Sequence, residues 1–200
     1  MKKNYFIRSF NLVLTFKLTS IFLILLGGAV KYFVSLTAAD HAGLFHTLTI
    51  TLNYFASVFI LVGFLLIIAV ILLVSLELIS RLLNDKVGNY FRSVYRTLLL
   101  RHFLYQSEHQ EKIVTIEGQP ITTYNPVNAT FNRAVRKCVV DVKQDGVIVL
   151  LKKPKTQQSQ KLLNDMIEQI KEKISSQNED YFFSSAQGTD SIIWFEGKRR

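Results

Sequence analysis

The feature that most constrains this chain is an uninterrupted apolar stretch, because residues 47–76 contain no Asp, Glu, Lys, Arg or His. A helix needs about 20 apolar residues to cross a hydrocarbon core that is about 30 Å thick. A buried helix of this length without a polar face would be unusual in a soluble protein. The stretch therefore predicts a transmembrane helix over residues 50–78.

Another apolar segment, residues 12–36, lies before this stretch in the sequence and contains two lysines, Lys17 and Lys31. Along a helix these lysines would lie about 21 Å apart. Their long side chains can extend in opposite directions and place both ammonium groups at the two membrane interfaces. The segment is too long for the apolar region of a signal peptide, and Lys31 interrupts it. We therefore expect an uncleaved span.

The charged flanks of the two segments predict their orientation. Basic residues precede the first segment and follow the second, whereas the loop TAADHAGLFH between them has no Lys or Arg. Since cytoplasmic flanks are enriched in Lys and Arg, we expect a multi-pass protein of the cell membrane with both termini in the cytoplasm. Residues 1–80 would form this two-span hairpin. Small residues would allow close packing within the hairpin or, alternatively, homo-oligomerisation: Gly27, Gly28, Ala56, Gly63 and Ala69.

Residues 81–111 are expected to form a basic amphipathic connecting helix. Arg92 and Arg96 share one side of this helix. The apolar and aromatic residues recur at roughly helical spacing on the other: Leu83, Val87, Tyr90, Phe91, Val94 and Leu98. The apolar face could pack on the following domain, or the helix could lie on the anionic inner leaflet. Glu77 and Arg81, four residues apart, could pair at the membrane interface as an anchor.

The pattern changes in residues 112–200, which predict a small cytosolic α+β domain with an antiparallel sheet and one packed helix. Short strands are expected on either side of a turn at residues 117–120, followed by a loop at residues 124–131. Asp145 and Gly146 form a hairpin turn between two β-branched runs. Thr156 could cap a helix that runs to about residue 177 with an apolar stripe, and two strands complete the domain.

The sequence shows no convincing catalytic pattern, so we expect a protein that is not an enzyme, with no catalytic residue, no metal site and no cofactor. No phosphate-binding GxxxxGK[ST] or GxGxxG motif and no HExxH, GxSxG or CxxC motif is present. Cys138 is expected to be a buried structural cysteine. Asp141, Asp145, Asp165 and Glu168 are interpreted as turn and solvent-facing residues.

The net charge of +9 makes the basic residues the candidate contacts for an anionic surface. They could face the membrane, bind nucleic acid through its phosphates, or simply be solvated. The candidate residues are Arg92, Arg96, Arg133, Arg136, Lys137, Lys152, Lys153, Lys155, Lys198, Arg199 and Arg200.

The layout resembles the N-terminal region of plasmid FtsK/SpoIIIE-like DNA translocases and conjugative coupling proteins. The similarity rests on the hairpin QDGVIVLL, the helix KLLNDMIEQIKEKI and the closing segment YFFSSAQGTDSIIWFEG. The resemblance implies two spans followed by a small α/β domain before a motor. The chain departs from the family pattern because no Walker motif follows, so the resemblance implies a relative without the motor.

These observations favour an integral membrane adaptor that holds an interaction domain at the inner leaflet, with the lipid bilayer and a protein partner as its contacts. The resemblance suggests an accessory role in DNA transfer or plasmid maintenance, on a mobile element. The alternatives are a membrane-tethered nucleic-acid-binding protein and a small membrane enzyme or transporter subunit.

Overall fold

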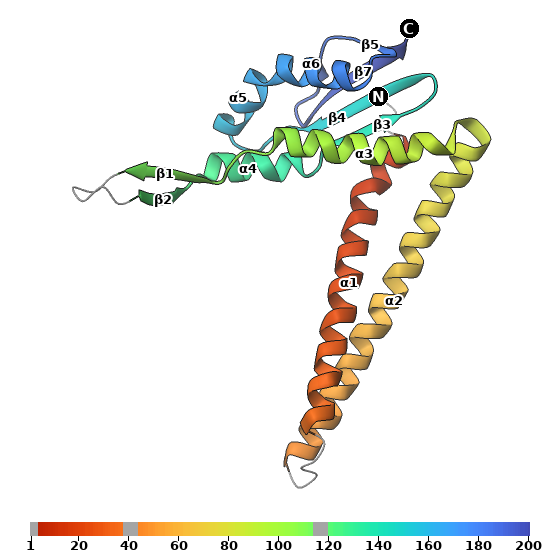
Figure 1. Cartoon of the computed structure of the whole chain (residues 1–200), viewed down its shortest axis with the longest axis vertical. Helices are drawn as coiled ribbons and strands as arrows, with labels where there is room; N and C mark the ends of the chain where they lie inside the picture. The colour runs from red at the N-terminus through yellow and green to blue at the C-terminus, as the bar shows by residue number, and fades with distance from the viewer. Residues whose placement is uncertain (1–3, 38–43, 114–119) are drawn as a thin grey trace. The chain divides into compact units, whose positions relative to one another are not determined.

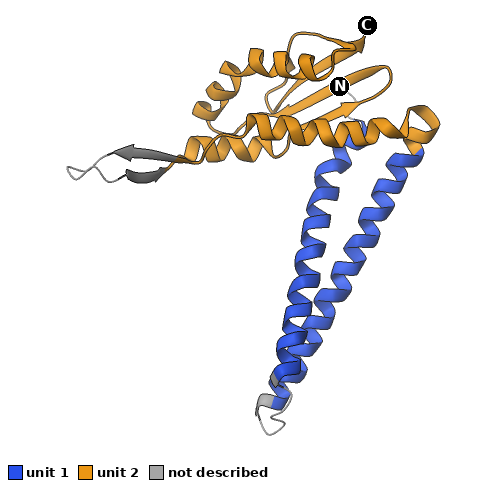
Figure 2. Ribbon diagram, viewed as in Figure 1, with its two compact units in different colours: residues 1–79 blue, residues 80–200 orange. Residues whose placement is uncertain are grey.

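The computed structural model describes residues 4–37, 44–113 and 120–200. The chain divides into two compact units, residues 1–79 and 80–200, which are described separately (Figure 2). The expected connecting segment, residues 81–111, falls within the second unit.

The first unit consists of helix α1 (Tyr5–Thr37) and most of helix α2 (Leu44–Asn84) (Figure 1). Both helices are long and apolar enough to cross a membrane, as expected from the two charge-poor segments. They extend beyond the predicted limits of residues 12–36 and 50–78. The outer loop predicted between them lies largely outside the described residues.

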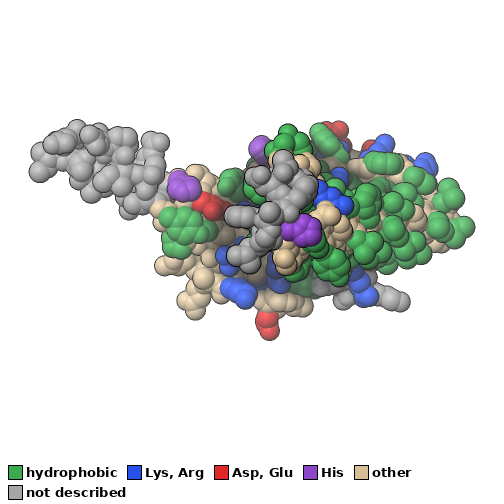
Figure 3. Space-filling model, turned by 90° about the horizontal axis from the view of Figure 1, so that it is seen from below, with side chains coloured by type: hydrophobic (Ala, Val, Ile, Leu, Met, Phe, Trp, Pro, Cys, Tyr) green, Lys and Arg blue, Asp and Glu red, His purple; other side chains and the backbone are tan. Residues whose placement is uncertain are grey.

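Most apolar side chains of α1 and α2 are exposed. Only 11% of the most apolar 18-residue segment of α1, and 6% of that of α2, is buried. A core helix of a soluble protein would show the opposite. Apolar side chains accordingly form a nearly continuous surface over part of the molecule (Figure 3). Lys17 and Lys31 are both exposed, as the interpretation of their side chains requires.

Small residues bring α1 and α2 into close contact. A Cβ added at Gly27 would lie 2.7 Å from Ile60 Cγ1 and 2.8 Å from the Ala56 carbonyl oxygen. A Cβ added at Gly63 would lie 2.6 Å from Ile24 Cγ1. These glycines therefore permit packing between the two helices of one chain, whereas Gly28 has nothing within 4 Å of an added Cβ.

The second unit contains a five-stranded antiparallel sheet, in the order β3-β4-β7-β5 with β6 also paired to β7. Its strands are β3 (Val139–Val142), β4 (Gly146–Lys152), β5 (Tyr181–Phe183), β6 (Gln187–Gly188) and β7 (Ile192–Arg199). The predicted hairpin between β3 and β4 is present, with pairs from Val142 with Val147 to Val139 with Leu150. Its turn lies one residue earlier than predicted, because the Lys143 amide donates to the Gly146 carbonyl at 2.8 Å and Gly146 already belongs to β4. A separate two-stranded ribbon pairs β1 (His109–Ile113) with β2 (Pro120–Tyr124). Its predicted turn, residues 117–120, lies almost entirely outside the described residues.

Four helices contribute buried side chains to the core of this unit, rather than the single packed helix expected from the sequence. They are α3 (Val87–Leu104), α4 (Pro126–Val135), α5 (Gln157–Asp165) and α6 (Ile167–Gln177). The predicted long helix is divided at Met166 into α5 and α6. Its apolar stripe is nevertheless directed inward, since Leu163, Ile170 and Ile174 are buried.

The loop predicted at residues 124–131 is wrong, because α4 occupies most of it. Asn125 caps this helix by accepting hydrogen bonds from the amides of Val127 and Asn128 at 3.0 and 3.2 Å. Pro126 follows at the first helical position, where its missing amide proton costs nothing. Phe131 and Val135 then enter the core.

Candidate functional site

Helix α3 is the element on which the candidate site is built, and its two faces are reversed relative to an ordinary surface helix. Its buried face is mostly polar, with Asn89, Ser93 and Thr97 followed by Leu100 and Leu104. Its exposed face is apolar: Phe91, Tyr95 and Leu98 are 65%, 62% and 51% exposed. The amphipathic helix is present as predicted, but its apolar face does not pack on the domain.

The polar face of α3 is buried because it completes the open edge of strand β3. The Thr97 hydroxyl accepts a hydrogen bond from the Val140 amide at 2.9 Å, and the Ser93 hydroxyl accepts one from the Val142 amide at 2.8 Å. Arg101 donates to the Cys138 carbonyl at 2.9 and 2.7 Å. These side chains take the place of the neighbouring strand that β3 lacks.

The spacing of helix and strand makes this pairing regular. Four residues of a helix rise about 6.0 Å, and two residues of a strand rise about 6.6 Å. Positions 93, 97 and 101 of α3 can therefore follow positions 142, 140 and 138 of β3 in antiparallel register. Position 144 falls outside this register: the Gln144 amide donates at 2.9 Å to Asp85 Oδ1, which also accepts from Asn89 Nδ2 at 2.7 Å.

A buried ion pair closes the end of this series. Arg81 donates to Asp141 Oδ1 at 2.5 Å and to the Val142 carbonyl at 2.9 Å. Arg81 and Asp141 are 2% and 1% exposed. The interpretation of Asp141 as a solvent-facing residue is therefore wrong: it balances a buried arginine. Asp85 lies 3.5 Å from Arg81 as a second buried carboxylate, and the shorter contact with Asp141 ties the chain at Arg81 to β3.

Cys138 is fully buried, as predicted, and has no sign of an activated thiol. Burial raises the pKa of the Cys138 thiol to about 12, and the positive charge of Arg101 only partly opposes this effect. Burial likewise lowers the pKa of Arg101. A thiol with a raised pKa remains protonated and is a poor nucleophile.

A groove of about 410 Å³ lies between α3 and the segment that joins α6 to β5. Arg92, Tyr95 and Arg96 of α3 line one wall, and Gln177, Glu179 and Asp180 are among the residues of the other. Tyr181 is held at the groove by donating its hydroxyl proton to the Lys143 carbonyl at 2.8 Å. Burial raises the pKa of Tyr181, although the positive charge of Arg199 acts to lower it.

The structure separates the candidate basic residues into two groups at opposite ends of the sheet. Strand pairing places Lys198 beside Gly146 and Lys152 beside Ile192, which are about 20 Å apart along β4. The group at the Gly146 end of β4 consists of Arg92, Arg96, Lys198, Arg199 and Arg200. The group at the Lys152 end of β4 consists of Arg133, Arg136, Lys137, Lys152, Lys153 and Lys155. Only Arg92 and Arg96 line the groove.

Sequence reasoning missed the pairing of Arg81 with Asp141 and the burial of Gln177, and it left open whether the apolar face of α3 packs on the domain. The available signal was the four-residue spacing of Asn89, Ser93 and Thr97, small polar residues that a solvent-facing helix would not require. Among the residues that the structure describes, no cluster of three His, Cys, Asp or Glu side chains is arranged to hold a metal ion.

Comparison of the chain with protein-family models, curated proteins and solved structures finds no match. The molecule is therefore characterised by its own features: a pair of long apolar helices, a small antiparallel sheet with covering helices, and a helix α3 whose apolar face is exposed.

Proposed function

We propose that this protein is a non-enzymatic membrane protein in which α1 and α2 span the bilayer and α3 lies on the cytoplasmic surface of the same membrane. The observation that carries the proposal is the reversed amphipathicity of α3. Its polar face is committed to β3, so Phe91, Tyr95 and Leu98 need an apolar neighbour other than the sheet.

A lipid surface is the occupant that best fits this face. Helix α3 begins at Val87, three residues after the end of α2, which is long and apolar enough to be a span. A helix that follows a span so closely starts at the depth of the lipid headgroups. Aromatic side chains and arginines are both favoured there, and Arg92 and Arg96 flank the exposed apolar face.

In this arrangement the second unit is held against the membrane and presents its remaining surface to a protein partner in the cytoplasm. The topology with both termini in the cytoplasm rests on the distribution of Lys and Arg in the sequence. A partner in DNA transfer or plasmid maintenance rests on the resemblance to coupling proteins alone.

Alkaline extraction of membranes tests the spanning helices: the protein should stay in the pellet and be released only by detergent. Release into the aqueous phase at high pH would contradict the proposal. A tag at the C-terminus should be inaccessible to protease in intact cells and accessible after permeabilisation.

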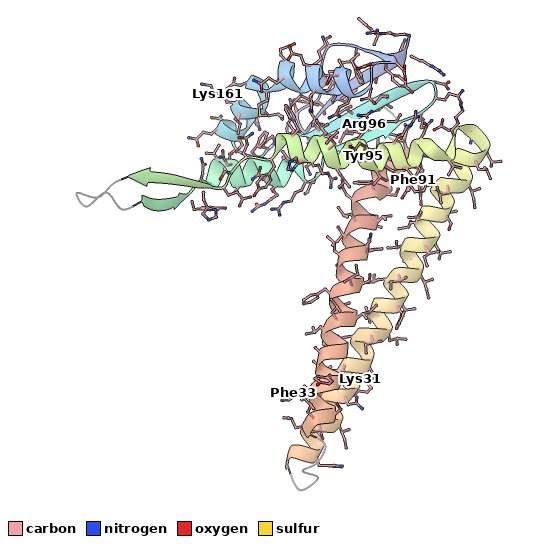
Figure 4. All side chains as sticks on the ribbon, viewed as in Figure 1. Lys31, Phe33, Phe91, Tyr95, Arg96 and Lys161 are labelled. Carbon is pink, nitrogen blue, oxygen red and sulfur yellow. The ribbon has the colours of Figure 1, made fainter. Side chains whose placement is uncertain are left out.

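Tryptophan quenching tests the position of α3. In a Trp194→Phe background, Phe91→Trp places a single tryptophan on the apolar face, and Lys161→Trp places one on the exposed surface of α5 as the control (Figure 4). In bilayers that contain brominated lipid, fluorescence at position 91 should be strongly quenched and fluorescence at position 161 should not. Equal, weak quenching at both positions would contradict contact between α3 and lipid.

Purification from mild detergent, followed by identification of co-purifying protein, tests the adaptor role. The adaptor role is supported if a specific protein co-purifies and no longer does so when surface residues of the second unit are substituted. Recovery of nucleic acid that is released steeply by salt would instead support the nucleic-acid alternative.

A further inference from the structure

The groove between α3 and the α6–β5 segment has the features of a ligand site rather than a surface depression. Its volume of about 410 Å³ is large enough for a small polar group. Gln177 in its wall is 8% exposed, and its Nε2 has no hydrogen-bond acceptor among the described residues. A buried donor without a partner destabilises the fold, and an acceptor from a ligand at this wall would remove that cost.

The groove combines two positive and two negative side chains that do not neutralise one another. Arg92 and Arg96 come from α3, and Glu179 and Asp180 come from the segment that follows α6. Among the described residues, no ion pair within 4.0 Å involves any of these four side chains. The groove is therefore electrostatically matched to a ligand that contains both an anionic and a cationic group.

The groove also opens onto the apolar face of α3. Tyr95 lines the groove and is itself 62% exposed, beside Phe91 and Leu98 on the outer face. Arg96 and Phe91 lie on different sides of the helix, and Tyr95 lies between these two sides (Figure 4). A ligand in the groove could thus extend an apolar tail along this face.

We infer that the groove binds the headgroup of a zwitterionic phospholipid of the phosphoethanolamine type. This inference rests on the membrane location proposed above. The phosphate lies between Arg92 and Arg96, and the primary ammonium lies at Glu179 and Asp180. Guanidinium groups suit phosphate oxygens, because they donate several hydrogen bonds in a fixed plane. A primary ammonium donates three hydrogen bonds to carboxylates, whereas the trimethylammonium of phosphocholine donates none.

Lipid titration of the full chain in detergent, followed by native mass spectrometry, tests the inference. Short-chain lipids with phosphoethanolamine, phosphocholine and phosphoglycerol headgroups are compared, and water-soluble glycerophosphoethanolamine reports binding of the headgroup without its tails. The phosphoethanolamine lipid should bind at least tenfold more tightly than the other two lipids, and more tightly than the soluble compound. Equal binding of the three lipids would overturn the inference, and tight binding of the soluble compound alone would replace the lipid with a free phosphoester.

Two pairs of substitutions separate the roles of the charges. Arg92→Gln with Arg96→Gln should weaken all three phospholipids at least tenfold. Glu179→Gln with Asp180→Asn should remove only the preference for phosphoethanolamine. Arg133→Gln with Arg136→Gln, at the other end of the sheet, should leave the affinity for all three lipids unchanged.

If the Arg133 and Arg136 variant loses as much binding as the Arg92 and Arg96 variant, the effect is one of overall charge and the inference is wrong. A protein that remains membrane-embedded but shows no headgroup preference would contradict the headgroup site and leave the proposed function intact. Recovery of the protein in the aqueous fraction would contradict the proposed function itself.

Discussion

Thr97 and Val140 form a closed pair of hydrogen bonds between a helix and a strand. The Thr97 hydroxyl accepts from the Val140 amide at 2.9 Å and donates to the Val140 carbonyl at 3.2 Å. The Ser93 hydroxyl likewise accepts from the Val142 amide at 2.8 Å, but the Asn89 carbonyl, at 2.7 Å, is a closer acceptor for its proton than the Val142 carbonyl at 3.3 Å. Two hydroxyls thus serve as the missing neighbour of β3.

Thr97→Val should destabilise the second unit by about 1–3 kcal/mol, because it leaves the Val140 amide and carbonyl buried without partners at nearly constant side-chain volume. Thr97→Ser keeps the hydroxyl and is the matched control. Denaturant unfolding of the full chain in detergent, followed by the fluorescence of Trp194 on β7, measures the difference. If Val and Ser at position 97 are equally stable, the hydroxyl does not support the strand.

Asp141→Asn should lower the free energy of unfolding by up to about 3–5 kcal/mol, since the buried Arg81 keeps the more distant carboxylate of Asp85 but loses that of Asp141. Asp165→Asn, at the exposed end of α5, makes the same chemical change without a buried partner. The same unfolding measurement applies. A loss of stability that is the same for both variants would show that the Arg81 contact is not important.

The raised pKa of Cys138 predicts how stability depends on pH. A group whose pKa is higher in the folded state contributes its full stability below the unfolded value of 9.0, and that contribution is lost as the pH rises toward about 12. The free energy of unfolding should therefore fall by up to about 1.4 kcal/mol per pH unit above pH 9 because of this thiol.

Cys138→Ala isolates this effect, because Tyr181 also has a raised pKa and titrates in the same direction. The difference between the slopes of the wild-type protein and the Cys138→Ala variant above pH 9 belongs to the thiol. The native thiol should also resist alkylating reagents at pH 8 and react after unfolding. Rapid alkylation of the folded protein would contradict its burial.

Gly27→Ala should loosen the packing of α1 on α2, because the new methyl group would lie 2.7 Å from Ile60 Cγ1 and 2.8 Å from a backbone carbonyl oxygen. Gly28→Ala, one position away, meets nothing within 4 Å and is the control. Thermal unfolding of the helices in detergent, followed by circular dichroism, measures the difference. The unfolding temperature should fall for the Gly27 variant only, and an equal fall for both variants would contradict the close contact.

The parts of the fold that depend on local signals were predictable from the sequence. The Asp145-Gly146 pair predicted the β3–β4 hairpin correctly, although the turn is formed by Gln144 and Asp145, and charge-poor segments predicted α1 and α2. The loop prediction at residues 124–131 failed although a local signal existed: Asn125 followed by Pro126 is a standard helix start.

The buried face of α3 could not be inferred in the same way. Ser93 and Thr97 are buried because their partners, Val142 and Val140, are distant in sequence and lack a neighbouring strand. Periodicity identifies which residues share a face, but not whether the polar or the apolar face meets the sheet. The same holds for Asp141, whose partner Arg81 belongs to the end of an apolar helix.

The role of α3 along β3 decides where the chain can be divided in the laboratory. A recombinant piece that starts at residue 112 would discard α3 and leave the backbone groups of Cys138, Val140 and Val142 open to any extended peptide, including a second copy of itself. Such a piece would precipitate, and its failure would say nothing of the native protein. A shorter version of this molecule has to retain Arg81 and helix α3.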